Sequence, residues 1–531
     1  MKIKTVTIIG GGSSGWMTAA ALAKLCPHLD VTVVESPNIP TVGVGESTLG
    51  HFNTYLQMLD LKDEDWMPAC NATYKNSIRF TNFRKKDGTH FEYPFISGFD
   101  YSYSPNGLAD WGDLAALYPD EFGPESFAKF YAPSNTLLAT HNREDNNSNG
   151  KLGPNYDFAN DTAYHLDAAA FGEYLKTEVC IPNGVKHLEK TVHSYDVDEK
   201  ENITRILCRD GTTLYSDLWI DCTGFKSLLL EHWMGEQFFP FEDKLANDAA
   251  WAVRLPYTDR ETQLENVTDC TALSNGWVWN IPLWNRIGTG YVFSTRFTSQ
   301  EEALREFLKH IKERYPDVNI DELKPFFIQI KHGRRRRAWS KNVVGIGLSY
   351  GFVEPLESTG LLTTHENIIH LVDILNRREG YTTQIERDAF NAVCQKTITT
   401  FRDFVALHYA AGTRTDTPYW RWATQRNNYM PDILGPDVKK HSNLDALTVR
   451  LTEHNLTEED QGACFIMAGL GLRPVSTSKY VKVRHKNNLN HLEEIKNAHS
   501  QMINQLEEYV KSLPTTYEYL RDNIYKDKDE S

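Results

Sequence analysis

The stretch "TVTIIGGGSSGWMTAAALAKL", residues 5–25, decides the fold of this 531-residue chain. An apolar, β-branched run over 6–9 leads into Gly10, Gly12 and Gly15, and an Ala- and Leu-rich helical pattern follows. This is the G-x-G-x-x-G spacing with a strand before it and a helix after it, the context in which the motif binds a dinucleotide. Gly10 permits the tight turn, Gly12 the approach of a pyrophosphate, and Gly15 the close packing of helix and strand.

Two further features complete the dinucleotide pattern. Ser13 and Ser14 open the expected helix, whose first N–H groups and positive dipole end favour a phosphate. A second strand, "DVTVVES", carries Glu35 about twenty residues after Gly15, where an acid grips a ribose hydroxyl. The alternative is a glycine-rich strand–helix turn that binds nothing, and the combination of strand, helix and acid favours the binding site.

Three separated segments favour FAD over NAD. The first is 5–50, in which "TVGVGESTLG" follows the second strand and suits a strap along a cofactor. The second is "LYSDLWIDCTGF" (214–225), a buried-type strand that ends in a small-residue turn, and the third is "KNVVGIGLSYGFVEPLESTGLL" (341–362), with another glycine turn. Flavoproteins of the glutathione-reductase and hydroxylase type build their FAD site from three such pieces. The cofactor contacts expected from the strap and the two later turns are Val44, Gly45, Glu46, Gly224 and Gly347.

The rest of the chain predicts an α/β protein with additions to this Rossmann-type core. Alternation in "GTGYVFSTRF" (288–297) indicates an antiparallel sheet inserted into the flavin fold. We expect the FAD-binding core and its inserted sheet over 1–375, and a mostly helical C-terminal region over 376–531 that covers the substrate pocket. The polar, Asn- and Gly-rich stretch 141–154 predicts a mobile surface loop.

Composition excludes several classes of protein. Lys and Arg number 56 against 71 Asp and Glu, and a net charge of −15 argues against nucleic-acid binding. No apolar run is long enough to cross a bilayer, and the N-terminus enters a strand without a signal-peptide pattern. The eight cysteines show neither C-x-x-C spacing nor the density of a disulfide scaffold. We therefore expect a cytoplasmic protein without a metal site.

Five motifs, "GGGSSGWMTAA", "VGVGEST", "NATYKNSIRFTNF", "GWVWNIPL" and "EPLESTG", resemble the flavin-dependent tryptophan halogenase family in order and spacing. The resemblance implies a two-component enzyme in which reduced FAD (FADH2), O2 and a halide ion, chloride, bromide or iodide, yield hypohalous acid. This oxidant passes down a tunnel to a lysine beside an electron-rich aromatic substrate. The chain has no second nucleotide-binding pattern, so a separate NAD(P)H-dependent flavin reductase would supply the FADH2. A flavin-dependent aromatic monooxygenase on the same scaffold is the alternative function.

The same resemblance assigns roles to individual residues. Lys75 in "NATYKNSIRF" matches the family's catalytic lysine and Glu357 in "EPLESTG" its active-site glutamate. Whether such a lysine forms a haloamine or holds hypohalous acid by a hydrogen bond stays open. Thr359 and Gly360 match the residues whose backbone N–H groups bind halide, although Ser358 and Thr359 also suit a helix cap.

The strip "GWVWNIPL" (276–283) matches the family's W-x-W-x-I-P motif. Two indoles of low conformational freedom and a proline would keep the organic substrate away from the flavin and let only a small oxidant pass. Without the family pattern, a core strand with aromatic packing would be the simpler interpretation. The residues implied to separate substrate and flavin are Trp277, Trp279, Ile281 and Pro282.

Three stretches depart from the family or receive no role. The C-terminal segment 454–474 lacks Tyr or Trp before Phe465, and "FEYPF" has Tyr93 where the family has histidine. These differences favour a loosely held indole or phenol over free tryptophan, with Phe95 stacking on its ring. The four arginines in "HGRRRRAW" indicate a solvated face without an assigned role. Native substrate, halide preference and the formation of a homo-oligomer stay open.

Overall fold

The computed structural model describes residues 2–38, 43, 45–424, 458–472, 478–485 and 489–526. It divides into two compact units, and each is built from three separate stretches of the chain. Unit 1 comprises Met1–Ala72, His165–Leu245 and Ile330–Arg402, and unit 2 comprises Thr73–Tyr164, Ala246–Gln329 and Asp403–Ser531.

Unit 1 is built on a six-stranded sheet with the order β20-β21-β12-β1-β2-β8. β1 lies between β12 and β2 and pairs in parallel with both, and β20 alone pairs antiparallel, with β21. Continuous apolar runs such as that of β1 suit a parallel sheet that is covered on both faces. The strand bounds are β1 Thr5–Ile9, β2 Asp30–Glu35, β8 Lys186–Glu189, β12 Leu218–Asp221, β20 Trp339–Ser340 and β21 Val343–Gly345.

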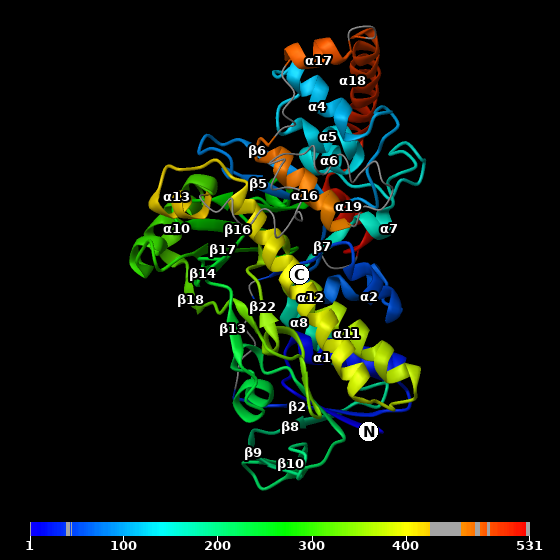
Figure 1. Ribbon diagram of the computed structural model, residues 1–531, viewed down its shortest axis with the longest axis vertical. Helices are drawn as coiled ribbons and strands as arrows, with labels where there is room; N and C mark the ends of the chain where they lie inside the picture. The colour runs from blue at the N-terminus through cyan, green and yellow to red at the C-terminus, as the bar shows by residue number, and fades with distance from the viewer. Residues whose placement is uncertain are drawn as a thin grey trace. The chain divides into compact units, whose positions relative to one another are not determined.

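Helices α1 (Ser13–Leu25) and α11 (Thr359–Arg377) pack together in unit 1, and α8 (Ala168–Tyr174) also packs on α1. Figure 1 shows these helices above the strands labelled β2 and β8. α1 begins directly after the glycine turn and buries a continuous run from Gly15 to Leu22. The further elements of this unit are α2 Phe52–Met58, α3 Asp63–Trp66, β3 Glu46–Ser47, β9 Val192–Val197, β10 Ile203–Cys208, β11 Thr213–Leu214, β13 Phe238–Pro240, β19 Gly333–Arg335 and β22 Gly351–Phe352.

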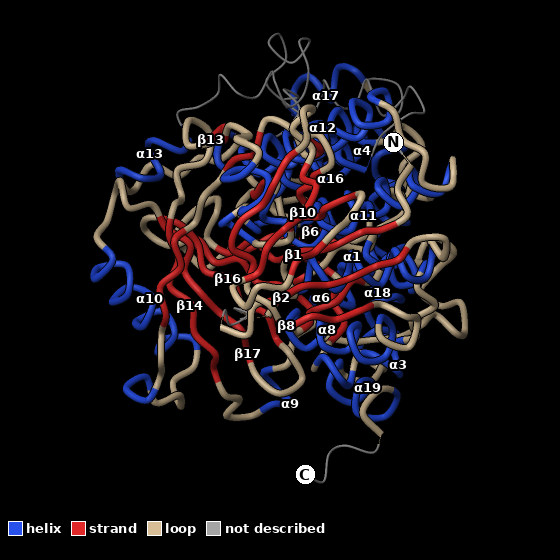
Figure 2. Tube along the Cα trace, turned by 90° about the horizontal axis from the view of Figure 1, so that it is seen from below, coloured by secondary structure: helices blue, strands red, loops and turns tan. Residues whose placement is uncertain are grey.

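Unit 2 is built on a seven-stranded sheet with the order β18-β14-β17-β16-β15-β5-β6. All neighbouring pairs are antiparallel except β15 and β5. Figure 2 shows β14, β16 and β17 running side by side. The strand bounds are β5 Ser77–Thr81, β6 His90–Pro94, β14 Ala249–Leu255, β15 Val267–Ala272, β16 Gly276–Pro282, β17 Ile287–Phe293 and β18 Phe326–Gln329.

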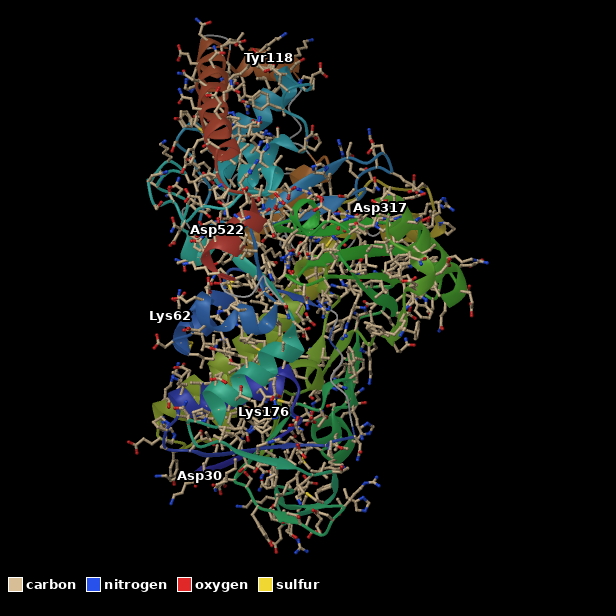
Figure 3. The ribbon with its side chains drawn as sticks, turned by 180° about the vertical axis from the view of Figure 1, so that it is seen from behind. Asp30, Lys62, Tyr118, Lys176, Asp317 and Asp522 are labelled. Atoms are coloured by element: carbon tan, nitrogen blue, oxygen red, sulfur yellow. The ribbon has the colours of Figure 1, made fainter. Side chains whose placement is uncertain are left out.

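Amphipathic helices cover this second sheet. α10 (Gln300–Arg314) begins with a capping box at Ser299 and inserts Phe307 and Ile311 into the core formed with β14 and β17. α4 (Leu108–Leu117) lies against α18 (Leu489–Lys511), where Tyr118, labelled in Figure 3, donates a hydrogen bond to Glu493. The other helices of the unit are α5 Ser126–Tyr131, α6 Pro133–His141, α7 Phe158–Asp161, α9 Arg260–Gln263, α13 Pro418–Thr424, α16 Glu458–Gly469, α17 Ser478–Arg484 and α19 Thr516–Asn523, and α12 Gln384–Ala410 has residues in both units.

The predicted architecture is confirmed. The strand within 214–225 ends at Asp221, the strand within 341–362 ends at Gly345, and 288–297 contributes to an antiparallel strand. All eight cysteines are buried and none forms a disulfide. Among the described residues, no helix is both long and apolar enough to span a membrane.

Two sequence predictions hold only in part. The stretch 141–154 is not only a surface loop, because Glu144 within it is completely buried and Arg143 forms a β-bridge with Thr515. The arginine run is not only a solvated face, because Arg335 is 1% exposed. In both cases the polar residue is buried because it has hydrogen-bond partners from distant parts of the chain, and the local pattern carries no information about those partners.

Candidate functional site

The first glycine turn in unit 1 is shaped by close backbone contacts. Gly10 has a φ of +116°, and a Cβ on it would stand 2.3 Å from the carbonyl oxygen of Cys222. A Cβ on Gly15 would stand 2.0 Å from the carbonyl oxygen of Gly10. Only glycine therefore lets the end of β1, the start of α1 and the residue after β12 approach this closely.

Gly12, by contrast, faces open space. It caps the N-terminus of α1, and no atom lies within 4 Å of the position that its Cβ would take. Ser13 and Ser14 form the first turn of the helix, and Ser14 lies beside the later glycine turn, 2.5 Å from where a Cβ of Gly347 would be. Open space at a helix N-terminus fits the pyrophosphate of a dinucleotide.

Glu35 at the end of β2 reaches back toward this turn. One carboxylate oxygen lies 2.6 Å from Nε2 of His187, and the other lies 1.8 Å from where a Cβ of Gly11 would be. Lys176, labelled in Figure 3, places its Nζ 3.9 Å from the same carboxylate and 5.7 Å from the centre of the Trp16 ring. The acid predicted for a ribose hydroxyl is therefore beside the glycine turn, and two basic side chains lie within 4 Å of it.

The two later turns of the expected FAD site are joined by Asp221, which the sequence placed only as the end of a strand. Its buried carboxylate accepts hydrogen bonds from Thr223 Oγ1 at 2.7 Å and from Ser349 Oγ at 3.0 Å. Its second oxygen accepts from the backbone N–H of Leu229 at 2.7 Å. Gly224, with a φ of +66° and open space around its missing Cβ, lies in the first of these turns.

Arg335 is a second connection that sequence reasoning missed. Its guanidinium donates to the carbonyl of Leu348 at 3.0 Å and to the carbonyl of Phe225 at 3.3 Å. It also pairs with Glu231, to which Nε donates at 2.9 Å. One buried side chain thus links the turn after β12 to the turn after β21.

The predicted halide residues begin α11. Ser358 has a φ of +56° and its hydroxyl contacts that of Ser47 at 3.0 Å, and Thr359 and Gly360 follow as the first residues of the helix. Glu46 on β3 lies beside them, with Oε2 3.7 Å from where a Cβ of Gly360 would be. Burial raises the pKa of Glu46 to about 7, so that its carboxyl group is largely neutral in weak acid.

Glu357 lies one residue before this left-handed turn, in a short helical turn over Pro355–Glu357. Its side chain is completely buried. Gly45 has a φ of +105° and continues the strap before Glu46, whereas Val44 lies outside the described residues. Unit 1 therefore holds Glu357 and all the described residues predicted for flavin and halide.

Lys75 lies in unit 2 at the end of β4 (Thr73–Lys75). The side chain is completely buried, and its Nζ lies 4.9 Å from the centre of the Phe95 ring, a cation–π contact. The hydroxyl of Thr73 donates to the carbonyl of Pro282 at 2.6 Å. This bond ties the strand of the lysine to the end of the tryptophan strip.

The tryptophan strip forms β16, between β15 and β17 in the sheet of unit 2, and all seven of its residues are buried. Trp277, Trp279 and Ile281 alternate along the strand and so share one face of the sheet. The two indoles are 6.3 Å apart, and the ring of Trp279 takes the space that a Cβ on Gly290 would need, 2.2 Å from Cη2. Neither indole N–H has a hydrogen-bond acceptor among the described residues.

Tyr93 and Phe95 belong to an aromatic cluster of unit 2. The Tyr93 ring lies 6.3 Å from Phe95, 6.2 Å from Phe404 and 5.8 Å from Phe465. Gly462 on α16 allows this packing, since a Cβ there would stand 2.6 Å from the Tyr93 hydroxyl. Unit 2 therefore brings together the predicted lysine, the tryptophan strip and the aromatic residues predicted for the substrate.

The chain is similar in sequence to known proteins. A family model described as tryptophan halogenase matches residues 5–486. The 7-chloro-L-tryptophan 6-halogenase KtzR of Kutzneria sp. (strain 744) is 35% identical over 459 residues, which cover 82% of this chain and 84% of KtzR.

Solved structures agree in fold along almost the full length. The apo structure of VirX1 matches with a TM-score of 0.91 and 55% identity, over 99% of this chain and 100% of that one. The tryptophan 6-halogenase SttH from Streptomyces toxytricini matches with a TM-score of 0.81 and 31% identity, over 97% of this chain and 99% of SttH. With a family model that spans most of the chain and relatives of this identity, the protein belongs to the tryptophan halogenase family and is a flavin-dependent halogenase.

Proposed function

We propose that this enzyme halogenates an electron-rich aromatic compound, of indole or phenol type, by means of hypohalous acid that is delivered to Lys75. The observation that carries the proposal is the environment of Lys75. Removing an ammonium group from water is costly unless the protein supplies a specific environment for it. Lys75 is completely buried on a strand beside an aromatic ring, which a merely structural strand lysine would not need.

The glycine turns of unit 1 fit FAD. We propose that Gly10, Gly12 and Gly15 admit the pyrophosphate, with Glu35 on the ribose, because the space over Gly12 is open and the Glu35 carboxylate lies beside Gly11. Bound reduced FAD supplies, with O2, the two-electron oxidation that turns a halide ion into hypohalous acid. The remaining proposed contacts are Ser13, Ser14, Val44, Gly45, Glu46, Gly224 and Gly347.

Halide would bind to the N–H groups of Thr359 and Gly360 at the start of α11, where the helix dipole favours an anion. A charged carboxylate at this position would repel the halide. The raised pKa of Glu46, about 7 as a result of burial, reduces that repulsion because it keeps the group protonated in weak acid.

In the aromatic step, Lys75 would either donate a hydrogen bond from Nζ to hypohalous acid or carry the halogen as a haloamine. The hydrogen bond would make the halogen more electrophilic toward the ring, whereas the haloamine would hold the halogen covalently beside it. Glu357 would orient the electrophile and take the proton that leaves the ring carbon. Its complete burial suits a base that works away from water.

Trp277, Trp279, Ile281 and Pro282 would keep the aromatic compound away from the flavin. The strip is suited to this because it is a central strand with bulky indoles on one face. Tyr93 and Phe95 would contact the substrate, and α16 from the C-terminal region 376–531 packs on Tyr93 through Gly462. KtzR and SttH are named as halogenases of 7-chloro-L-tryptophan and of tryptophan. In this chain, Tyr93 and the short segment 454–474, which has no Tyr or Trp before Phe465, favour a more open pocket that holds an indole or phenol loosely.

We further propose that a separate NAD(P)H-dependent reductase supplies the FADH2, and that the enzyme works in the cytoplasm. The absence of disulfides among its eight buried cysteines is consistent with a reducing compartment.

The test is a reaction of the protein with FAD, a flavin reductase, NADH and chloride, bromide or iodide, against a panel of indoles and phenols. Mass spectrometry should show a product in which halogen replaces hydrogen, only when halide is present. A product that gains oxygen in the absence of halide would contradict the proposal and assign the protein as a monooxygenase.

A further inference from the structure

Glu144 is a buried carboxylate of unit 2 that accepts hydrogen bonds from Asn76, the residue after Lys75, and the roles proposed above do not use it. Its side chain is completely buried. Nδ2 of Asn76 donates to its two oxygens at 3.0 and 3.1 Å, and Nδ2 of Asn266 donates to Oε1 at 3.0 Å. The hydroxyl of Thr516 lies at 3.4 Å from the same oxygen. Three donors from three distant parts of the chain therefore converge on one carboxylate.

The groups that contact the Glu144 oxygens suit a carboxylate better than a carboxylic acid or an amide. All of them are N–H or O–H groups, and an ionised carboxylate is an acceptor on both oxygens. Burial raises the pKa of Glu144 to about 7, and its hydrogen bonds to Asn76, Asn266 and Thr516 act in the opposite direction. A carboxylate kept inside the protein at such a cost indicates that the network has a task, because an apolar residue would fill the space more cheaply.

Asn76 is the residue that connects this network to the lysine. It lies between the end of β4 at Lys75 and the start of β5 at Ser77. Its backbone N–H donates to the carbonyl of Asn266 at 2.8 Å, and its carbonyl accepts from the N–H of Phe95 at 3.1 Å. Phe95 is the ring above which the ammonium of Lys75 lies. Fixing Asn76 therefore fixes both the lysine and the ring that faces it.

The other side of Glu144 is bound to the C-terminal segment. Its backbone N–H donates to the carbonyl of Pro514 at 3.3 Å, and the N–H of Thr516 donates to the carbonyl of Asn142 at 3.1 Å. Thr516 is the first residue of α19, whose Tyr519 ring lies 6.0 Å from that of Tyr74.

α19 also supports the end of the tryptophan strip. The ring of Trp284 is nearly parallel to two rings of the C-terminal segment, with centroids 5.5 Å from that of Tyr517 and 4.1 Å from that of Tyr525. Asp522, labelled in Figure 3, marks the end of this helix. The C-terminal helix thus contacts the neighbours of Lys75 and the continuation of the strip at the same time.

We propose that Glu144 is a positioning residue for halogenation: through Asn76 it holds Lys75 over Phe95, and through Thr516 it makes that geometry depend on the docked C-terminal helix α19. This inference rests on the proposed role of Lys75. An error of about 1 Å in the place of a reacting group can reduce a rate by up to roughly 100-fold. The network acts on the delivery of the halogen and not on the formation of hypohalous acid, because none of its residues belongs to unit 1.

The test is Glu144→Gln, which preserves size but turns one acceptor oxygen into an N–H2 group that faces the N–H2 of Asn76. We expect kcat for aromatic halogenation to fall roughly 10- to 100-fold, with KM for the aromatic substrate changed by less than about threefold. Hypohalous acid, captured by a small diffusible trap, should still form at the wild-type rate. Combined with Lys75→Ala, the substitution should cause no further loss.

Asp113→Asn is the matched control. Asp113 is another buried carboxylate of unit 2, on α4, and it pairs with Arg484 at the end of α17 and with the adjacent His485. It should lower thermal stability while leaving the ratio of aromatic product to trapped hypohalous acid unchanged. Thr516→Val removes a single donor and should give the same pattern as Glu144→Gln at a few-fold size, which keeps the proposal testable if Glu144→Gln does not fold.

Two failures can be told apart. If Glu144→Gln and Thr516→Val both behave like Asp113→Asn while Lys75→Ala is inactive, Glu144 has only a structural role and the inference is overturned. If Lys75→Ala itself halogenates at the wild-type rate, the proposed function is wrong, and the inference falls with it.

Discussion

The two units of this protein would serve the reaction by different physical means. Unit 1 presents mainly backbone, in the form of glycine turns and the N-termini of α1 and α11. Unit 2 presents buried side chains, among them Lys75 over Phe95 and the two indoles of β16. The difference teaches that binding of a large cofactor requires positions without side chains, whereas delivery of a small electrophile requires side chains in defined positions.

A pair of glycine substitutions tests most strongly whether unit 1 depends on positions without side chains. Gly15→Ala should cost at least about 3 kcal/mol of unfolding free energy, because its Cβ would stand 2.0 Å from a backbone oxygen. Gly12→Ala should cost only about 1 kcal/mol of unfolding free energy, because Ala is a poorer N-cap than Gly. It should weaken FAD binding at least about tenfold, because its Cβ would enter the open space expected to hold the pyrophosphate.

Thermal melting and flavin fluorescence titration measure the two effects separately. If Gly12→Ala bound FAD as tightly as the wild type, the pyrophosphate would have to lie elsewhere.

Arg335→Lys tests whether the stability and FAD affinity of unit 1 also depend on a side chain. Lysine lacks the planar fork that reaches the carbonyls of Leu348 and Phe225 together with Glu231. We expect a loss of about 1–3 kcal/mol in unfolding free energy, weaker FAD binding, and an unchanged halogenation rate per bound flavin. Chemical denaturation and flavin titration check this.

The neighbouring Arg336, which is exposed, provides the control Arg336→Lys. A fall in FAD affinity of equal size in both variants would show that the buried fork of Arg335 has no special part in FAD binding.

A smaller effect concerns a buried histidine in each unit. Burial lowers the pKa of His365 in unit 1 to about 3 and that of His499 in unit 2 to about 4. Because both values are below the ordinary 6.5, the unfolded chain takes up these protons first. The stability they contribute is complete above pH ~6.5 and is lost as the pH falls toward the folded values.

His365→Phe preserves ring contacts with Phe52 and removes the titration. We expect the unfolding free energy to fall less steeply on acidification, by up to about 1.4 kcal/mol per pH unit between the two pKa values. Denaturant unfolding at several pH values measures the slope. An unchanged slope for His365→Phe would show that this histidine is already protonated in the folded protein.

The fold and its glycine turns could be predicted because backbone requirements leave a spacing in the sequence. Gly10, Gly12 and Gly15 recur at intervals that a strand–turn–helix demands, and β16 and β17 alternate with the period of a strand. Lys75 could be singled out only through the flanking motif, because one lysine on a strand has no pattern of its own.

The residues that join distant segments by hydrogen bonds could not be predicted from the sequence, because their partners are set by the fold. Each of Asp221, Arg335 and Glu144 has at least one hydrogen-bond partner more than one hundred positions away in the sequence, such as Ser349 for Asp221. The local sequence around a polar residue does not indicate whether it has such a distant partner. Glu144 in particular lies in an Asn- and Gly-rich segment whose composition predicts a loop at the surface.

The central claim is that unit 1 makes the oxidant and Lys75 in unit 2 delivers it. The most direct measurement compares wild type and Lys75→Ala in the same reaction with FADH2, O2 and halide, and quantifies trapped hypohalous acid and halogenated aromatic product together. The account predicts equal amounts of trapped oxidant and at least about 100-fold less aromatic product from Lys75→Ala. Aromatic product at the wild-type rate from that variant would contradict it.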